Sequence, residues 1–339
     1  MPTRQELQLL QALPLELKIM KTKQRIREWV ARFGVDGVYV SFSGGKDSTV
    51  LLHIVRELYP EVEAVFVDTG LEYPEIRKFV KGFENVTWLR PKMRFDEVIK
   101  KYGYPIVSKE VADCIQGARN GQIRRIKRLN GTLQDKKGNL SMFNCANWKP
   151  LFYLPFKISD RCCVIMKKEP VKKYEKKTGK VGITGQMAEE SYLRLKRWLQ
   201  VGCNAFNAKR PISNPLSFWT NQDILQYIKE NSLQISSIYG EIVDSEFLKN
   251  GQLCFEGCET WKTTGADRTG CIFCLFGMHL EKDETRLQRL HRTHPKLYDY
   301  CMNGGEFVDG NWQPNKKGLG MKFVCDEVNR VMGKELLRY

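Results

Sequence analysis

Residues 43–48, Ser-Gly-Gly-Lys-Asp-Ser, combine small, basic and acidic residues in a pattern suited to phosphate binding. They follow an apolar run of strand character at 38–42 and precede apolar residues with helical spacing. Small residues in such a turn leave backbone N–H groups free at a helix N-terminus, where the helix dipole favours an anion. The sequence therefore predicts a phosphate loop made of Ser43, Gly44, Gly45, Lys46, Asp47 and Ser48.

This loop differs from a Walker A motif. A Walker A motif has Ser or Thr after its lysine, but here Asp47 follows Lys46. The first glycine of a Walker A motif, five residues before the second, is also missing here, because Val40 stands there. The alternative is a glycine-rich turn that binds nothing, since strand-to-helix turns of this composition are common.

A second candidate segment, Asp68-Thr69-Gly70, follows an apolar stretch at 63–67 that predicts the next strand. In an open α/β sheet, ligands bind beyond the carboxyl ends of the strands. Asp68, Thr69 and Gly70 are therefore expected to face the same crevice as the phosphate loop. Alternatively, Asp68 caps the helix that begins near Pro74.

Two pairs of cysteines, Cys162-Cys163 and Cys271-x2-Cys274, stand out among the eleven in the chain. A C-x-x-C motif places two thiolates on one centre, and adjacent cysteines can bind two irons of one cluster. A rival set, Cys254-x3-Cys258-x12-Cys271-x2-Cys274, has the spacing of a compact zinc site. A cysteine-rich core without metal is the third possibility. The remaining cysteines are expected to be ordinary buried residues: Cys114, Cys145, Cys203, Cys301 and Cys325.

The net charge of +16 comes mostly from one part of the 339-residue chain. Residues 114–181 hold 17 Lys or Arg against 4 Asp or Glu, which favours a polyanionic or phosphate-bearing partner such as nucleic acid. A run of solvated charges is the alternative. The sequence has neither an apolar run of about 18 residues nor an apolar signal region, so we expect a cytoplasmic protein with no membrane partner.

Strands and helices alternate along most of the chain, which predicts an α/β fold. Helices are expected at 14–33, 74–81, 95–102 and 109–129, strands at 86–89 and 181–184, and a loop at 304–320. Thr220 and Asp223 have the spacing of a capping box at the start of a further helix. The order of residues 1–13 is left open. We expect three regions: a helical lead-in at 1–36, a nucleotide-binding α/β domain at 37–235 with a basic insertion near 114–160, and a cysteine-rich metal-binding region at 236–339.

Several segments resemble the ATP pyrophosphatase and phosphoadenylyl-sulfate reductase superfamily. Residues 43–48 are similar to its S-G-G-x-D-S loop, and Val67-Asp-Thr-Gly is similar to the segment beside its nucleotide. Residues 185–194 resemble G-x-R-x-x-E-S-x-x-R, although Met187 stands at the first Arg. The tandem cysteines with Lys-x-Glu-Pro and the distant C-x-x-C resemble the [4Fe–4S] ligands of adenylyl-sulfate reductases.

The resemblance implies an adenine nucleotide alpha hydrolase-like fold, an open, mostly parallel sheet with helices on both faces, plus a cysteine-rich helical region. It also implies that Gly185 and Arg194 contact the nucleotide, that Lys46 neutralises phosphate charge, and that Asp47 or Asp68 holds Mg²⁺. The implied cofactors are ATP and a [4Fe–4S] cluster on Cys162, Cys163, Cys271 and Cys274, with zinc as the alternative metal.

Three functions follow from this resemblance. The first is an enzyme that cleaves ATP between its α- and β-phosphates to adenylate a nucleic acid, with sulfur supplied by a donor such as a cysteine desulfurase. The second is an adenylyl-sulfate or phosphoadenylyl-sulfate reductase, although the last cysteine, Cys325, does not lie in the E-C-G-L-H segment of reductases. The third is a nucleotide- or DNA-binding regulator without catalysis.

Overall fold

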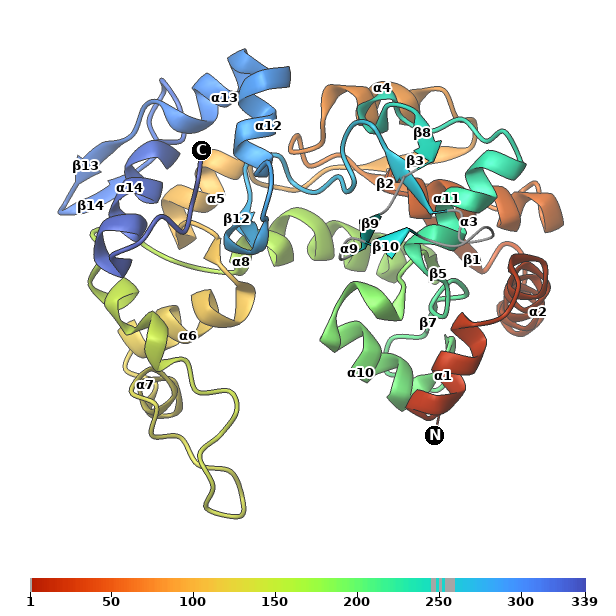
Figure 1. The fold of residues 1–339 in the computed structure, drawn as a ribbon, viewed down its shortest axis with the longest axis horizontal. Helices are drawn as coiled ribbons and strands as arrows, with labels where there is room; N and C mark the ends of the chain where they lie inside the picture. The colour runs from red at the N-terminus through yellow and green to blue at the C-terminus, as the bar shows by residue number, and fades with distance from the viewer. Residues whose placement is uncertain (1, 245–247, 250–251, 254–259) are drawn as a thin grey trace. The chain divides into compact units, whose positions relative to one another are not determined.

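The computed structural model describes residues 2–244, 248–249, 252–253 and 260–339 (Figure 1). The chain forms two compact units. The first, here called the loop unit, comprises Met1–Asp68, Glu72–Leu89 and Val171–Thr269. The second, the cysteine unit, comprises Thr69–Leu71, Arg90–Pro170 and Gly270–Tyr339. Both units are therefore built from segments that are remote in sequence.

A six-stranded sheet forms the centre of the loop unit, in the order β3-β2-β1-β5-β7-β6 (Figure 1). All neighbouring strands pair in parallel except β6, which is antiparallel to β7. Val40 of β1 is in register with Ala64 of β2 and Ile183 of β5. The strands are β1 (Val38–Ser41), β2 (Ala64–Val67), β3 (Val86–Leu89), β5 (Val181–Thr184), β6 (Asn204–Ala205) and β7 (Ile212–Ser213).

Both faces of this sheet are buried, as is typical of parallel sheets covered by helices. On one face, Tyr39 and Val65 pack with Tyr174 of α9. On the other, Val40 and Ala64 are fully buried. The predicted α/β fold with an open, mostly parallel sheet is confirmed.

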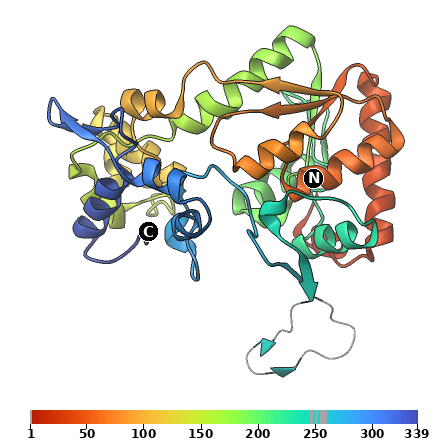
Figure 2. The same cartoon turned by 90° about the horizontal axis from the view of Figure 1, so that it is seen from above.

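Helices in the loop unit follow the predicted alternation (Figure 2). Two of them are joined by a buried ion pair, in which the Lys18 ammonium lies 2.7 Å from the Asp223 carboxylate. Thr220 begins α11 with the predicted capping box, accepting a hydrogen bond from the Asp223 N–H. The helices are α1 (Arg4–Gln11), α2 (Leu15–Phe33), α3 (Lys46–Leu58), α4 (Pro74–Lys81), α9 (Glu169–Thr178), α10 (Tyr192–Val201) and α11 (Asn221–Glu230). Short elements are the 3₁₀ turns Ala188–Glu190 and Ser237–Tyr239, and strands β8 (Ile242–Asp244), β9 (Leu248–Lys249), β10 (Gln252–Leu253) and β11 (Trp261–Thr263).

The cysteine unit is mainly helical. Its helices are α5 (Phe95–Tyr102), α6 (Lys109–Arg119), α7 (Ile123–Leu129), α8 (Arg161–Cys163), α12 (Arg286–Thr293), α13 (Pro295–Met302) and α14 (Met321–Met332). Its other elements are strands β4 (Ile106–Val107), β12 (Leu275–Phe276), β13 (Glu306–Val308) and β14 (Asn311–Gln313), the 3₁₀ segments Ala146–Tyr153 and Met278–Leu280, and the π-helix Val164–Lys168.

Two contacts join the remote segments of the cysteine unit. Strand β12 pairs in parallel with β4, so the segment after Cys274 is tied to residues 106–107. The Tyr104 hydroxyl donates a hydrogen bond to the Leu319 carbonyl. Segment 90–170 and the C-terminal segment thus share one core.

Two local predictions are corrected, and one question left open by the sequence is resolved. The helix expected at 109–129 is two helices, because Gly121 has a φ of 76° and ends the first. Residues 304–320, expected to be a loop, contain the β13–β14 hairpin. The lead-in before Pro14, whose order was left open, forms α1 with a capping box between Thr3 and Glu6. Within the described residues, no helix combines the length and apolar character needed to cross a bilayer.

Candidate nucleotide site and cysteine group

The phosphate loop connects β1 to α3 and requires a glycine at position 44. Gly44 has a φ of 72°, a conformation that L side chains rarely adopt. A Cβ atom there would also lie 2.7 Å from Val80 Cγ2 and 2.8 Å from Ile76 Cγ2. The Ser48 hydroxyl accepts a hydrogen bond from the Ser43 N–H at 3.1 Å and so closes the turn.

Gly44→Ala should therefore destabilise the protein more than a matched change at Gly34. Gly34 has a φ of 76°, but no described atom lies within 4 Å of an added Cβ. Backbone strain alone should cost about 1–3 kcal/mol in Gly34→Ala, because the Gly34 φ of 76° and ψ of 159° fall in a region used almost only by glycine. Overpacking should add about 1–3 kcal/mol in Gly44→Ala. Urea unfolding of the two variants measures the difference, and equal losses would contradict a steric role for the loop glycine.

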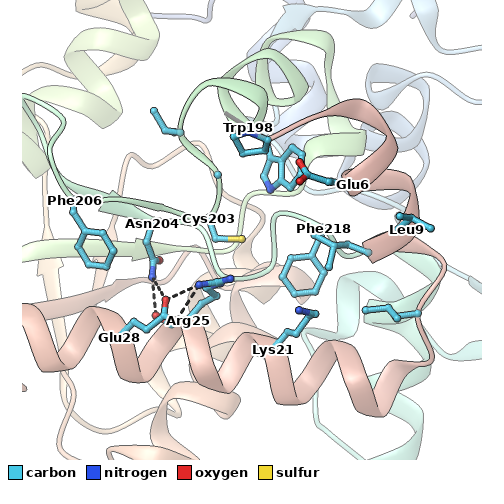
Figure 3. A pocket seen from close by; sticks show the side chains of 15 residues that line it. Glu6, Leu9, Lys21, Arg25, Glu28, Trp198, Cys203, Asn204, Phe206 and Phe218 are labelled. Carbon is cyan, nitrogen blue, oxygen red and sulfur yellow. Dashed lines mark hydrogen bonds and ion pairs between the residues drawn. The ribbon is translucent and has the colours of Figure 1, made fainter.

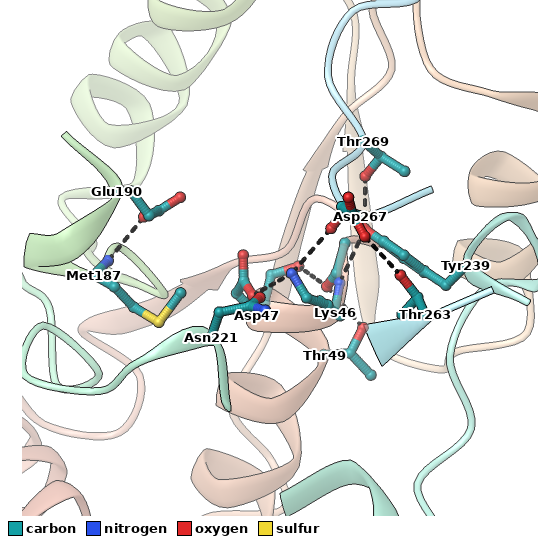
Figure 4. Close-up of polar contacts among 12 residues, drawn as sticks. Lys46, Asp47, Thr49, Met187, Glu190, Asn221, Tyr239, Thr263, Asp267 and Thr269 are labelled. Atoms are coloured by element: carbon teal, nitrogen blue, oxygen red, sulfur yellow. Dashed lines mark hydrogen bonds and ion pairs between the residues drawn. The ribbon is translucent and has the colours of Figure 1, made fainter. Parts of the chain in front are cut away.

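Lys46 is held by groups from a distant part of the chain (Figure 4). Its side chain is buried, and its ammonium donates a hydrogen bond to the Asp267 carbonyl at 3.2 Å. Its backbone N–H donates to the Tyr239 hydroxyl, which lies 2.7 Å from the Thr269 hydroxyl. Burial raises the pKa of Tyr239 to about 12, so this hydroxyl keeps its proton and can donate it to Thr269.

Asp47 offers an oxygen without a hydrogen-bond partner. Its Oδ1 atom is buried and accepts no hydrogen bond from the described residues, although the Lys46 ammonium lies 3.5 Å away. Leaving a buried carboxylate oxygen unsatisfied is costly. Because Mg²⁺ is usually bound by one or two carboxylates together with phosphate oxygens, the Asp47 side chain fits the predicted role of a cation ligand.

Arg194 contributes a further positive charge. It forms an ion pair with Glu190, which also accepts a hydrogen bond from the Met187 N–H at 2.9 Å. Burial and the positive charge of Arg268 lower the pKa of Arg194, while the negative charge of Asp47 opposes them. The two guanidinium groups thus repel each other, and a bound phosphate near them would relieve that repulsion.

Arg268→Gln is expected to weaken nucleotide binding by about tenfold to a hundredfold, the usual effect of losing one hydrogen bond to a charged group. Isothermal titration calorimetry with ATP measures this change. Arg197→Gln provides the control, because Arg197 is an exposed residue of α10. Equal affinities in the two variants would remove Arg268 from the site.

Gly185 and Asp68 have clear structural roles. A Cβ atom on Gly185 would lie 3.1 Å from the Asp47 carbonyl oxygen, so glycine allows the end of β5 to approach the start of α3. Asp68 is buried at the end of β2, and its carboxylate accepts a hydrogen bond from Arg77 at 2.9 Å. Tyr73 occupies the N-cap of α4, so Asp68 does not cap that helix.

Thr69 and Gly70 belong to the cysteine unit rather than the loop unit. The Thr69 hydroxyl accepts a hydrogen bond from the Leu71 N–H at 3.2 Å. Gly70 has a φ of 73° and so provides the turn after β2. A nucleotide contact at these two residues stays a prediction.

A cavity of about 740 Å³ in the loop unit lies among α1, α2 and α10 (Figure 3). Trp198, Phe206 and Phe218 form its aromatic walls. The residues that line it include none of the phosphate-loop residues. The phosphate loop is therefore identified by its backbone and charges, and not by this cavity.

The four cysteines of the first predicted set all lie within the cysteine unit. Cys162 and Cys163 share a hydrogen bond, and the charges of Cys271 and Cys274 act on Cys162. The hydrogen bond from Cys162, with the positive charges of Lys109 and Lys167, lowers the pKa of Cys163 to about 6. Burial raises the pKa of Cys274 to about 12.

Four neighbouring thiols suit an iron–sulfur cluster by their donor chemistry. A single zinc ion needs its thiolates about 3.8 Å apart, the tetrahedral spacing for Zn–S bonds of about 2.3 Å. In the described part of the chain, no three His, Cys, Asp or Glu side chains are arranged around one metal ion. In a [4Fe–4S] cluster, by contrast, each thiolate binds a different iron, so the thiolates need not surround one ion. Cys254 and Cys258 of the rival set lie outside the described residues.

Residues 37–274 match the phosphoadenosine phosphosulfate reductase domain. The chain belongs to this family. It is 24% identical over 263 residues to an uncharacterized protein of Methanocaldococcus jannaschii, covering 77% of this chain and 46% of that protein. It is 23% identical to the adenosine 5'-phosphosulfate reductase of Staphylococcus haemolyticus (65% of this chain, 72% of that protein). It is 24% identical to the phosphoadenosine 5'-phosphosulfate reductase of Gloeobacter violaceus (64% and 70%).

A solved structure, the phosphoadenylyl-sulfate reductase of Candida auris in a phosphate complex, is 16% identical with a TM-score of 0.37, covering 70% of this chain and 91% of that one. The chain spans less than half the length of two curated relatives. It covers 46% of the first Methanocaldococcus jannaschii protein and 15% of a second uncharacterized protein from the same organism.

Sequence reasoning within the family missed three contributors to the loop site, namely Tyr239, Asp267 and Thr269. Thr269 stands two residues before Cys271, inside a polar run that carries no motif of its own. Its place is revealed by its hydrogen bond with the Tyr239 hydroxyl, which accepts a hydrogen bond from the Lys46 N–H. Arg268, which lies between Asp267 and Thr269 in the sequence, likewise belongs to no recognisable motif.

Proposed function

We propose that this member of the family binds ATP at residues 43–48 and cleaves it between the α- and β-phosphates during sulfur transfer. One observation carries the proposal. At the N-terminus of α3, the buried Lys46 ammonium lies 3.5 Å from an Asp47 oxygen that accepts no hydrogen bond from the described residues. A cation and a carboxylate oxygen that accepts no hydrogen bond, both at a helix N-terminus, are the groups that a magnesium–phosphate ligand requires.

The loop residues have distinct roles in this reaction. The N–H groups of the turn bind the pyrophosphate portion, and Lys46 neutralises the charge that develops on it as an acceptor oxygen attacks the α-phosphorus. Asp47 would hold Mg²⁺, and the positive charge of the ion would stabilise the phosphate oxygens. Arg194 and Arg268 bind the remaining phosphate charge. The products of this step are an adenylated acceptor and pyrophosphate.

The burial of Cys325 favours ATP over a sulfonucleotide as the substrate. A reductase needs an accessible thiolate to attack the sulfonate sulfur, but Cys325 is fully buried in α14, and burial raises its pKa. The neighbouring Cys301 is fully buried as well. The last two cysteines of the chain are thus poor candidates for that nucleophile.

The cysteine group would hold a [4Fe–4S] cluster through Cys162, Cys163, Cys271 and Cys274. Because a cysteine would ligate each of its four irons, such a cluster would supply electrons when it is present, and no iron would be open to bind sulfur. Lys109 and Lys167 lie close enough to Cys163 to stabilise its thiolate form. A protein that carries a persulfide, such as a cysteine desulfurase, would be the sulfur donor.

Nucleic acid is the proposed acceptor because of the basic segment at 114–181. Not all of its charge is available, since Arg125 pairs with Asp113, and Arg128 is buried against Glu110. Arg124 and Lys127 of α7 remain exposed. Two exposed aromatic side chains of the same segment, Phe143 and Tyr153, could stack on bases. Exposed aliphatic side chains accompany them: Ile123, Leu140 and Met142.

The second candidate is a sulfonucleotide reductase. It is favoured by the similarity of the chain to the reductases of Staphylococcus haemolyticus and Gloeobacter violaceus. The third is a regulator that binds nucleotide or DNA without turnover. All three candidates share a nucleotide at the phosphate loop.

One set of assays separates the three. Anaerobically purified protein is incubated with ATP and Mg²⁺, with and without DNA or RNA, and AMP and pyrophosphate are measured. A parallel assay supplies adenylyl sulfate or phosphoadenylyl sulfate with thioredoxin and measures sulfite. Pyrophosphate that rises with nucleic acid supports the proposal, sulfite without ATP consumption supports the reductase, and tight binding without either product supports the regulator.

A further inference from the structure

A second pair of thiols lies in the cysteine unit, in addition to the four cysteines described above. Cys114 lies in α6, and Cys145 directly precedes the 3₁₀ segment Ala146–Tyr153. The Cys145 thiol donates a hydrogen bond to the Cys114 sulfur, and the two sulfur atoms are 3.1 Å apart. Both side chains are buried. Two sulfurs at this distance can form a disulfide after an approach of about 1 Å.

Helix α7 holds both cysteines in place. The Cys114 thiol lies 3.5 Å from the Arg125 carbonyl oxygen, and the Cys145 N–H donates a hydrogen bond to the Arg128 carbonyl at 3.0 Å. The Arg128 side chain also donates to the Phe143 carbonyl at 2.8 Å, two residues before Cys145. The pair is therefore fixed by backbone contacts on both sides, and is not an accident of two mobile side chains.

The two thiols differ in reactivity. The hydrogen bond from Cys145, together with the positive charges of Arg128 and Arg125, lowers the pKa of Cys114 to about 7. The same hydrogen bond and burial raise the pKa of Cys145. Cys114 is therefore the thiol that ionises first and attacks, and Cys145 is the thiol that completes the bond. Because both side chains are buried, an oxidant reaches Cys114 when the surrounding segment opens locally.

We propose that Cys114 and Cys145 form a reversible disulfide, with a low-molecular-weight disulfide as the oxidant. The Cys114 thiolate attacks one sulfur of the oxidant and releases the first thiolate. Cys145 then loses its proton, attacks the Cys114 sulfur and releases the second. The oxidant is reduced to two thiols, and the two cysteines lose two protons and two electrons.

This disulfide encloses the part of the basic segment that contains α7. The covalent ring runs from 114 to 145 and contains α7 together with the exposed Leu140 and Met142. Oxidation would restrict the conformations of this segment. It would act on the surface proposed to bind nucleic acid, but the chemistry of the pair is independent of that proposal.

Peptide mapping tests the pair directly. Anaerobic protein is treated with oxidised glutathione, and in parallel with the smaller oxidant diamide, then denatured in iodoacetamide and digested with trypsin. Cleavage yields residues 110–119 and 138–157, each with one cysteine, because Pro150 protects Lys149 from trypsin. We expect these two peptides to be recovered cross-linked, and a reducing agent to separate them.

Cys301 and Cys325 provide an internal control. Both are buried, and the charge of Cys325 helps to raise the pKa of Cys301. Their peptides, 297–316 and 323–330, should be recovered in alkylated form and not cross-linked. In Cys145→Ala, residues 110–119 should instead carry glutathione. Recovery of both 110–119 and 138–157 in alkylated form after both oxidants would overturn the proposal, as would cross-linking of Cys114 to a different cysteine.

Discussion

Lys46→Gln should lower kcat/KM for ATP cleavage by about 10²–10³-fold, comparable to the removal of one preorganised donor from a transition state. The side chain is buried, and its ammonium is fixed by the Asp267 carbonyl at 3.2 Å. No reorganisation is then needed when charge develops on the leaving pyrophosphate. Glutamine keeps most of the length of the side chain but removes the positive charge.

The control for this change is Lys196→Gln, an exposed lysine of α10. It should leave kcat/KM unchanged within about twofold, since a screened surface charge contributes little. Melting curves should show that both variants remain folded. A Lys46→Gln enzyme with full activity would exclude the phosphate loop as the site of cleavage.

Cys163→Ser should abolish iron binding. Protein purified without oxygen is expected to contain about four irons and four labile sulfides per chain, as a [4Fe–4S] cluster held by four thiolates requires. Serine removes a thiolate whose pKa is lowered to about 6. Iron and sulfide analysis and the visible absorption spectrum measure the loss.

Two control variants separate the ligand sets. Cys258→Ser should keep its iron, because Cys258 belongs only to the rival zinc set, and Cys203→Ser should keep it because Cys203 lies in the loop unit. Zinc in place of iron, lost in Cys258→Ser but kept in Cys163→Ser, would favour the rival set. The redox part of the proposed function would then have to be abandoned.

Much of the sheet and of its helices could be predicted from sequence because the signals are local. Helix α4 begins and ends where predicted, since Pro74 starts it and Gly82 follows it. Strands β3 and β5 also match their predicted ranges. The phosphate loop is equally local, because strand, turn and helix are contiguous in the chain.

The rest could not be read from sequence because it depends on contacts between remote segments. Tyr239 lies 193 residues from Lys46, and the Lys46 ammonium reaches a carbonyl 221 residues away. Cys114 and Cys145 were expected to be ordinary buried cysteines. They are buried, but only the fold of α7 places their sulfurs 3.1 Å apart.

The strand order has a consequence for how this protein is made. Strand β1 lies between β2 and β5, but β5 is about 140 residues further along the chain, so at about 5–20 residues per second the ribosome takes roughly 10–30 s to supply it. During that time one edge of β1 has no partner strand, and exposed edges invite pairing with other chains. The nascent chain should therefore depend on chaperones until β5 emerges and pairs with the open edge of β1.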